Sequence, residues 1–170
     1  MRSNTRRRAR VVLAGAVLLA AVAFASGDNE QGVPYPDGFR AWQHVKSDVV
    51  GAAHPSFPVR GGIHHFYANR LAVEGYRAGK FPNGAILVDE GLFTSEGEGP
   101  ATGMVLEGER RSVEVMVKDD GTYKETGGWG FERFVGSSRS GRLATTDKAT
   151  CFACHSIRKD HDLVFSSIRP

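Results

Sequence analysis

Alternation of apolar and polar side chains predicts that strands make up most of this chain. Over residues 112–118, three valines occupy every second position and polar or larger side chains stand between them. That period of two is typical of a strand with one buried face. Further segments rich in β-branched and aromatic residues predict strands over 44–50, 63–68 and 129–135, and residues 85–88 predict the start of a buried strand.

Helices are expected to be few and short. Asn69 is a favourable N-cap, and residues 70–78 predict a helix that Gly79 ends. Residues 39–42 and 149–155 predict one or two helical turns each. We expect Glu107-Gly108-Glu109 to turn a hairpin between 103–106 and 112–118, and residues 94–102 to form a mobile connection. The predicted fold class is α+β, mainly an antiparallel β-sheet with a few short helices.

The first 25 residues have a different pattern. Five arginines within the first ten residues precede an apolar run over 11–24, which ends at Ala23-Phe24-Ala25. A basic head, a short apolar core and small residues at the exit describe a secretory signal peptide over 1–25. A transmembrane anchor is the alternative, but this run is short for a hydrocarbon core. We therefore expect cleavage near Ala25, a periplasmic or otherwise exported product, and no stable membrane insertion afterwards.

The remaining length has room for one domain of ordinary size. We expect a flexible N-terminal segment over 26–34 and a single domain over 35–170. The whole chain carries 22 basic and 19 acidic residues, and loss of the five arginines leaves 17 against 19, or about −2. A slightly acidic domain without a basic stripe gives no reason to expect a nucleic-acid partner.

The only two cysteines lie in Cys151-Phe152-Ala153-Cys154-His155. A zinc site would need further ligands at matching spacing, and a thioredoxin-like pair would need a βαβ alternation that the chain lacks. C-x-x-C-H is typical of c-type haem attachment, and this reading also explains the adjacent histidine. Two thiols one turn apart can add to the two vinyl groups on one porphyrin edge, and the histidine can bind iron.

We therefore predict one covalently attached haem c, packed against the sheet, with Cys151 and Cys154 as the attachment points and His155 as the iron ligand. A disulfide or other thiol chemistry remains the alternative.

Several other side chains could provide a sixth iron ligand or a distal base. For each of them an ordinary surface, hydrogen-bonded, capping or core role is the better interpretation. His64 and His65 are neighbours in a predicted strand, so their side chains point to opposite faces and at most one could face a haem. The candidate ligands are His44, His54, His64, His65, His161, Met104 and Met116, and the candidate base is Asp147.

The order of several short segments resembles the cytochrome P-460 family, which includes the β-sheet cytochromes c-prime. The resemblance covers about residues 35–168. It rests on Tyr35-Pro36-Asp37-Gly38-Phe39-Arg40-Ala41-Trp42, His65-Phe66-Tyr67-Ala68-Asn69, Gly79-Lys80-Phe81-Pro82-Asn83-Gly84, Val117-Lys118-Asp119, Gly127-Gly128-Trp129-Gly130-Phe131 and the terminal segment from Cys151 to Phe165.

This resemblance implies a homodimer of sheet-based subunits, each with one haem, His155 as the axial ligand and an open distal side. Catalytic members of the family oxidise hydroxylamine and join a lysine covalently to the porphyrin, on the strand after the F-x-[DN]-G turn. Here that strand reads Ile86-Leu87-Val88-Asp89-Glu90, without a lysine, and Lys80 precedes the turn.

The missing lysine makes the chain more similar to the c-prime type. That type binds nitric oxide, carbon monoxide or another small ligand at five-coordinate iron, or passes single electrons to redox partner proteins. Oxidation of hydroxylamine remains the alternative function.

Overall fold

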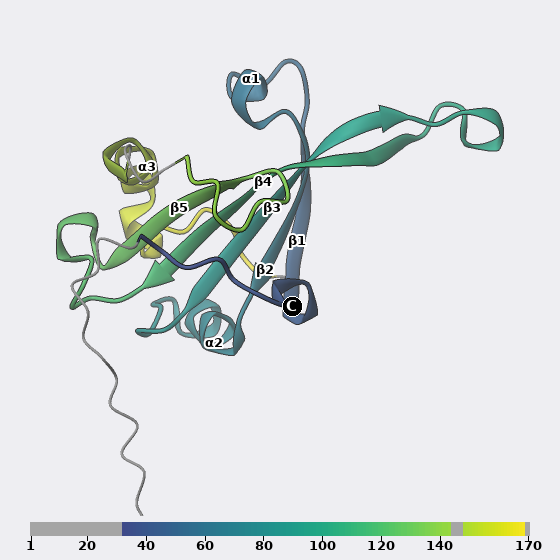
Figure 1. Cartoon of the computed structure of the whole chain (residues 1–170). Coiled ribbons are helices and arrows are strands. Elements are labelled where there is room, and N and C mark those ends of the chain that lie inside the picture. The colour runs from purple at the N-terminus through teal and green to yellow at the C-terminus, as the bar shows by residue number, and fades with distance from the viewer. Residues whose placement is uncertain (1–31, 144–147, 169–170) are drawn as a thin grey trace, which may run out of the picture.

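The computed structural model describes residues 32–143 and 148–168, and its centre is one five-stranded antiparallel sheet (Figure 1). Neighbouring strands follow one another in the chain, so each connection joins adjacent antiparallel strands. The α+β prediction is confirmed. The strands are β1 (Gln43–Val50), β2 (Gly62–Ala68), β3 (Ile86–Glu96), β4 (Val105–Lys118) and β5 (Trp129–Val135).

Short helices connect and flank these strands. None of the described helices is long and apolar enough to cross a membrane. The α-helices are α1 (Phe57–Arg60), α2 (Arg70–Ala78) and α3 (Lys148–His155), and the 3-10 helices are η1 (Phe39–Ala41), η2 (Gly99–Ala101), η3 (Lys124–Thr126) and η4 (Ser156–His161).

The predicted limits of α2 are confirmed at both ends. The Asn69 side chain accepts a hydrogen bond from the backbone N–H of Ala72 at 2.8 Å, which satisfies one of the free donors of the first turn. Gly79 follows the last helical residue in the left-handed conformation, with φ of 73°, a common way to end a helix.

The expected hairpin around Glu107-Gly108-Glu109 is wrong. These residues lie inside β4, where Glu107 pairs with Thr94 of β3. The chain turns earlier, between Gly97 and Met104, whose backbone groups are hydrogen-bonded at 3.0 Å. Gly99 and Gly103 supply the positive φ values that this turn requires, whereas Gly108 stays in a strand. Consequently, residues 94–96 of the expected mobile connection are part of β3.

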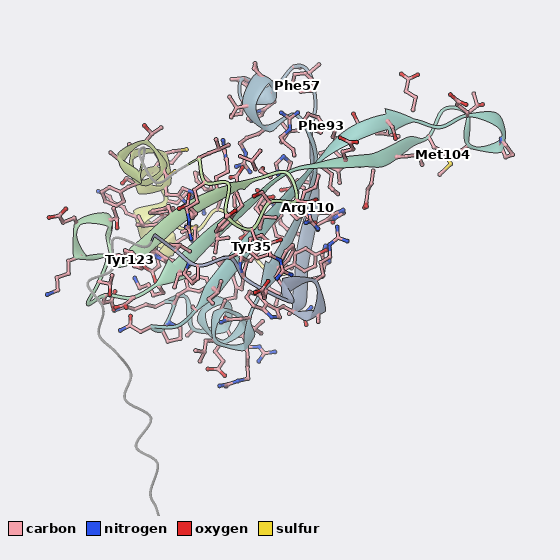
Figure 2. All side chains as sticks on the ribbon, viewed as in Figure 1. Tyr35, Phe57, Phe93, Met104, Arg110 and Tyr123 are labelled. Atoms are coloured by element: carbon pink, nitrogen blue, oxygen red, sulfur yellow. The ribbon has the colours of Figure 1, made fainter. Side chains whose placement is uncertain are left out.

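The ends of β3 and β4 project beyond the sheet as a two-stranded arm, residues 93–111 (Figure 1). Pairing between β2 and β3 stops at Leu92, and pairing between β4 and β5 starts at Ser112, so neither arm strand has a second neighbour. Met104 lies near the far end of the arm and is 54% exposed (Figure 2).

Each face of the sheet packs against a different part of the chain. On β3, Leu87 belongs to one apolar cluster and the next residue, Val88, belongs to the other. The N-terminal segment covers the second face with Val33 and Phe39. The first face packs against α2, α3 and the C-terminal segment, which is yellow in Figure 1.

The predicted segments at the N-terminus fall mostly outside the described residues. This applies to the signal peptide over 1–25 and to residues 26–31 of the expected flexible segment. Val33, however, is only 1% exposed, and its carbonyl accepts a hydrogen bond from Arg142 at 2.7 Å. Packed structure therefore begins before Tyr35.

Candidate haem-attachment site

The predicted attachment motif lies at the end of α3, on the first face of the sheet. Cys151 is half-buried and packs with Phe152 against the apolar cluster of that face, while Cys154 is exposed. The two cysteines are not joined to each other by a disulfide. Residues three apart on a helix lie on the same side, so these thiols can both meet one edge of a planar group.

His155 ends α3 with its two ring nitrogens in different situations. Nδ1 lies 2.7 Å from the backbone carbonyl oxygen of Leu163. A carbonyl only accepts, so Nδ1 carries the proton and Nε2 carries a lone pair. Among the described residues, Nε2 has no hydrogen-bond partner. A histidine held in this tautomer by a backbone carbonyl is the arrangement that metal-ligating histidines use.

Aromatic rings and charged groups surround the imidazole of His155. The ring centroids of Phe131 and Phe165 lie 5.1 and 5.0 Å away. Burial lowers the pKa of His155 below its usual value, and the positive charge of Arg60 adds to that effect, whereas the Leu163 carbonyl and the Glu114 carboxylate oppose it. The net effect favours neutral imidazole, the form that binds metals.

A row of side chains runs across the sheet on the same face. Antiparallel pairing places Asp89 of β3 opposite Glu114 of β4, and Glu114 opposite Arg133 of β5. Arg60, at the end of α1, donates to Asp89 at 2.5 Å and also to Glu114. The second oxygen of Glu114 pairs with Arg133 at 2.9 Å, so both carboxylates are compensated within the row.

His64 of β2 belongs to this charged row as well, and it is only 1% exposed. Its Nε2 donates to the carbonyl of Arg60 at 2.6 Å, and its Nδ1 lies 2.8 Å from Asp89. Burial opposes a charge on this ring, but the Asp89 carboxylate outweighs burial and raises the pKa of His64. His65 points to the other face, where it contacts Ser47 and Glu107, as predicted for neighbours in a strand.

Most of the other candidate iron ligands are engaged elsewhere or exposed. His64 has both ring nitrogens engaged, His44 hydrogen-bonds Ser47, and His54 accepts from the backbone of Ser56. His161 is exposed and pairs with Asp160, and Met104 lies on the arm. Met116 alone remains, since it is paired with Phe131 on the face that carries His155. Asp147 lies outside the described residues.

The sequence alone did not single out Arg60 or Glu114. Arg60 follows a loop-like segment rich in proline and glycine, where nothing indicates which face of the sheet the side chain will reach. For Glu114 the sequence did contain a usable pattern: the residue stands between alternating valines and must therefore lie on the opposite face of β4 from them. That face carries the charged row.

These residues fit a haem better than they fit the alternatives. A structural zinc site needs four ligands, and the described residues contain no group of three that could hold a metal ion. The motif instead offers two thiols on one side of a helix and one open imidazole nitrogen, which is the donor set of a c-type haem.

Comparison with known proteins identifies the family of this chain. The family model described as cytochrome P460 matches residues 36–166, which is most of the chain. A comparison with curated proteins found no significant match. The family match covers both faces of the sheet and the whole attachment motif, and so the chain belongs to the cytochrome P460 family and is a haem cytochrome.

Proposed function

We propose that this protein is an exported c-type cytochrome with a single haem, which binds a small ligand such as nitric oxide or carbon monoxide at five-coordinate iron. Cys151 and Cys154 form the thioether bonds and His155 is the axial ligand. In addition to binding this ligand, or instead of it, the protein passes single electrons to redox partners, and it acts as a homodimer.

One observation carries the attachment proposal. His155 commits Nδ1 to the Leu163 carbonyl and leaves Nε2 without a partner among the described residues, one residue after a pair of cysteines on the same side of α3. When bound, haem supplies an iron centre for diatomic ligands and for one-electron transfer. The chain itself orients the imidazole, fixes its tautomer and surrounds it with Phe131 and Phe165.

The side chains available as sixth ligands support five-coordinate iron. Within the described chain, the histidines other than His155 are hydrogen-bonded or exposed. His64 and Met116 both share the face of His155, but both ring nitrogens of His64 are engaged, which leaves Met116. A site without a strong internal ligand leaves one coordination position for a small external one.

The attachment is tested by expressing the full chain in a host that matures c-type cytochromes. We expect an intact mass equal to residues 26–170 plus one haem, and colour that stays with the polypeptide after acid extraction. The Cys151→Ala, Cys154→Ala double variant should lose its colour on extraction. A double variant that keeps its colour after extraction, or a wild type that loses it, would disprove thioether attachment.

The ligand-binding part has a separate test. The absorption spectrum of the reduced protein should be that of high-spin, five-coordinate iron and should change when carbon monoxide is added. Met116→Leu is the matched control, and it should leave both spectra unchanged. A low-spin wild-type spectrum that does not change with carbon monoxide would reject gas binding. If the spectrum of Met116→Leu is then high-spin, Met116 is the sixth ligand.

Oxidation of hydroxylamine is the second candidate, and Glu114 is the observation in its favour. Its carboxylate lies close enough to His155 to affect the pKa of that ring, and carboxylates can accept protons. Both oxygens of Glu114, however, already accept from Arg60 and Arg133, and Asp89 stands where catalytic relatives would need a lysine. Turnover of hydroxylamine with an electron acceptor would reverse this ranking.

A further inference from the structure

We propose that the Lys118–Asp162 ion pair is a positioning device for the axial histidine. The pair fixes the position of the Leu163 carbonyl. This carbonyl accepts a hydrogen bond from Nδ1–H of His155 and thereby sets how strongly the neutral imidazole donates to iron. The inference rests on the proposed role of His155 as the iron ligand. Lys118 and Asp162 are positioning residues because they act through Leu163.

The Asp162 carboxylate joins three separate parts of the chain to the turn that follows η4. One oxygen accepts from the backbone N–H of Phe81 at 2.9 Å. The other accepts from Lys118 Nζ at 3.0 Å and from Trp129 Nε1 at 3.4 Å. These partners come from the loop after α2, the end of β4 and the start of β5. The turn is therefore fastened to the sheet through this one side chain.

The backbone of the turn needs such a fastening. Asp162 and Leu163 are consecutive non-glycine residues with positive φ values of 51° and 67°, and no other non-glycine residue described has a positive φ. Side chains disfavour this conformation, so it persists only where the surroundings hold it. The same two residues aim the Leu163 carbonyl at His155, 2.7 Å from Nδ1.

Lys118 is buried, and its ammonium group is held in place by several partners besides Asp162. Its side chain is only 3% exposed, and it also donates to the carbonyl of Gly127 at 3.1 Å and pairs with Asp120 at 3.2 Å. Its ammonium group lies 5.3 Å from the centre of the buried Trp129 ring. A buried lysine is costly unless it is paired, so its retention here calls for a role.

Hydrogen bonds of this kind tune a metal through its ligand. A carbonyl that holds the imidazole N–H firmly makes the ring more basic, which strengthens the iron–histidine bond and favours ferric over ferrous iron. Loosening the Leu163 carbonyl should therefore weaken the bond and raise the reduction potential.

The experiment measures the iron–histidine stretching frequency by resonance Raman spectroscopy and the reduction potential of the purified haem protein. Asp162→Asn and Lys118→Met should both lower the frequency and raise the potential. We expect the ferric-to-ferrous equilibrium to shift about threefold to tenfold, a tenfold change being about 59 mV for one electron. Asp160→Asn is the matched control, because Asp160 is an exposed acid of the preceding helix η4 that, among the described residues, pairs with Arg158 and His161.

Two opposite outcomes separate positioning from a simple field effect. If the two charges act only through space, loss of the carboxylate raises the potential and loss of the ammonium lowers it, with an unchanged frequency. That result would overturn the proposal. Parallel shifts in both variants, with a lowered frequency, would establish it.

If Asp162→Asn does not accumulate as folded protein, a further variant tests the positioning role. Asp162→Glu keeps the charge but lengthens the side chain, so it displaces the turn without changing the field. A lowered frequency supports the proposal and an unchanged one rejects it. If the wild type carries no covalent haem, the proposed function fails; if it does and no variant shifts, only this inference fails.

Discussion

His64 shows at the residue scale how the charged row makes stability depend on pH. Burial opposes its charge, but the hydrogen bond and charge of Asp89, together with the Arg60 carbonyl, raise its pKa above the ordinary value. A raised pKa means that the folded protein binds this proton more tightly than the unfolded chain. The resulting stability is fully present below about pH 6.5 and is lost as pH rises through the folded-state pKa.

We therefore predict that the free energy of unfolding falls from pH 6 to pH 9, and that part of this fall disappears in His64→Gln. Urea unfolding of the haem protein across this range measures it. His54→Gln is the control, because His54 lies in an exposed loop, and this variant should keep the wild-type pH dependence. An identical fall in His64→Gln would assign the effect to another group.

At the scale of elements, Asn69 ties three pieces of structure together. Its Oδ1 accepts from Ala72 of α2 and from Ile86 of β3, and its Nδ2 donates to the carbonyl of Gly84 at 2.9 Å. One side chain therefore begins the helix and fixes the approach to the next strand.

Asn69→Ala should lower the free energy of unfolding by about 2–3 kcal/mol, about 1 for the helix cap and the rest for the two lost hydrogen bonds. Asn69→Asp is the matched variant, because it keeps the acceptor and loses only the donor to Gly84. We expect it to cost about 1 kcal/mol. Equal losses in the two variants, measured by urea unfolding, would contradict this division.

The two-stranded arm should be the least stable part of the sheet. A strand pair with no further neighbour is marginal in water, and local stability follows the number of buried contacts. Amides of 94–96 and 105–107 should exchange at least about 100-fold faster than those of Val113 and Val115. Hydrogen exchange is measured at low and at high protein concentration. Arm amides as well protected as those of Val113 and Val115 would contradict the prediction, and arm protection that rises with concentration would show that another chain covers the arm.

The sequence could predict those elements whose ends are marked by local chemistry. Asn69 and Gly79 bound α2, and the valines of β4 reveal its buried face. The turn of the arm was misplaced because Gly108 and Gly103 look alike in a sequence, and only strand pairing decides which one adopts a positive φ.

The proposed attachment motif could be predicted because its three residues lie within five consecutive positions of the chain. The charged row and the Asp162 contacts were not, because they join residues that only the register of the sheet brings together. Arg60 meets Asp89 and Glu114, for example, across three separate elements.

The whole molecule should change the sign of its charge on maturation. The full chain has a formal charge of +3, and removal of the five arginines before residue 11 leaves about −2. We predict that the exported protein begins at Ser26 and binds an anion exchanger at pH 7. N-terminal sequencing of protein from the periplasmic fraction tests this. Recovery of the full-length chain in the membrane fraction would favour an uncleaved anchor instead.

The separation of the two sheet faces has a practical consequence. Val33 packs on the face opposite α3 and His155. Immobilising the protein on an electrode through its N-terminus would therefore leave the histidine side turned towards the solution. The carbon monoxide binding and electron transfer that we propose could then be measured with the tether on the other face.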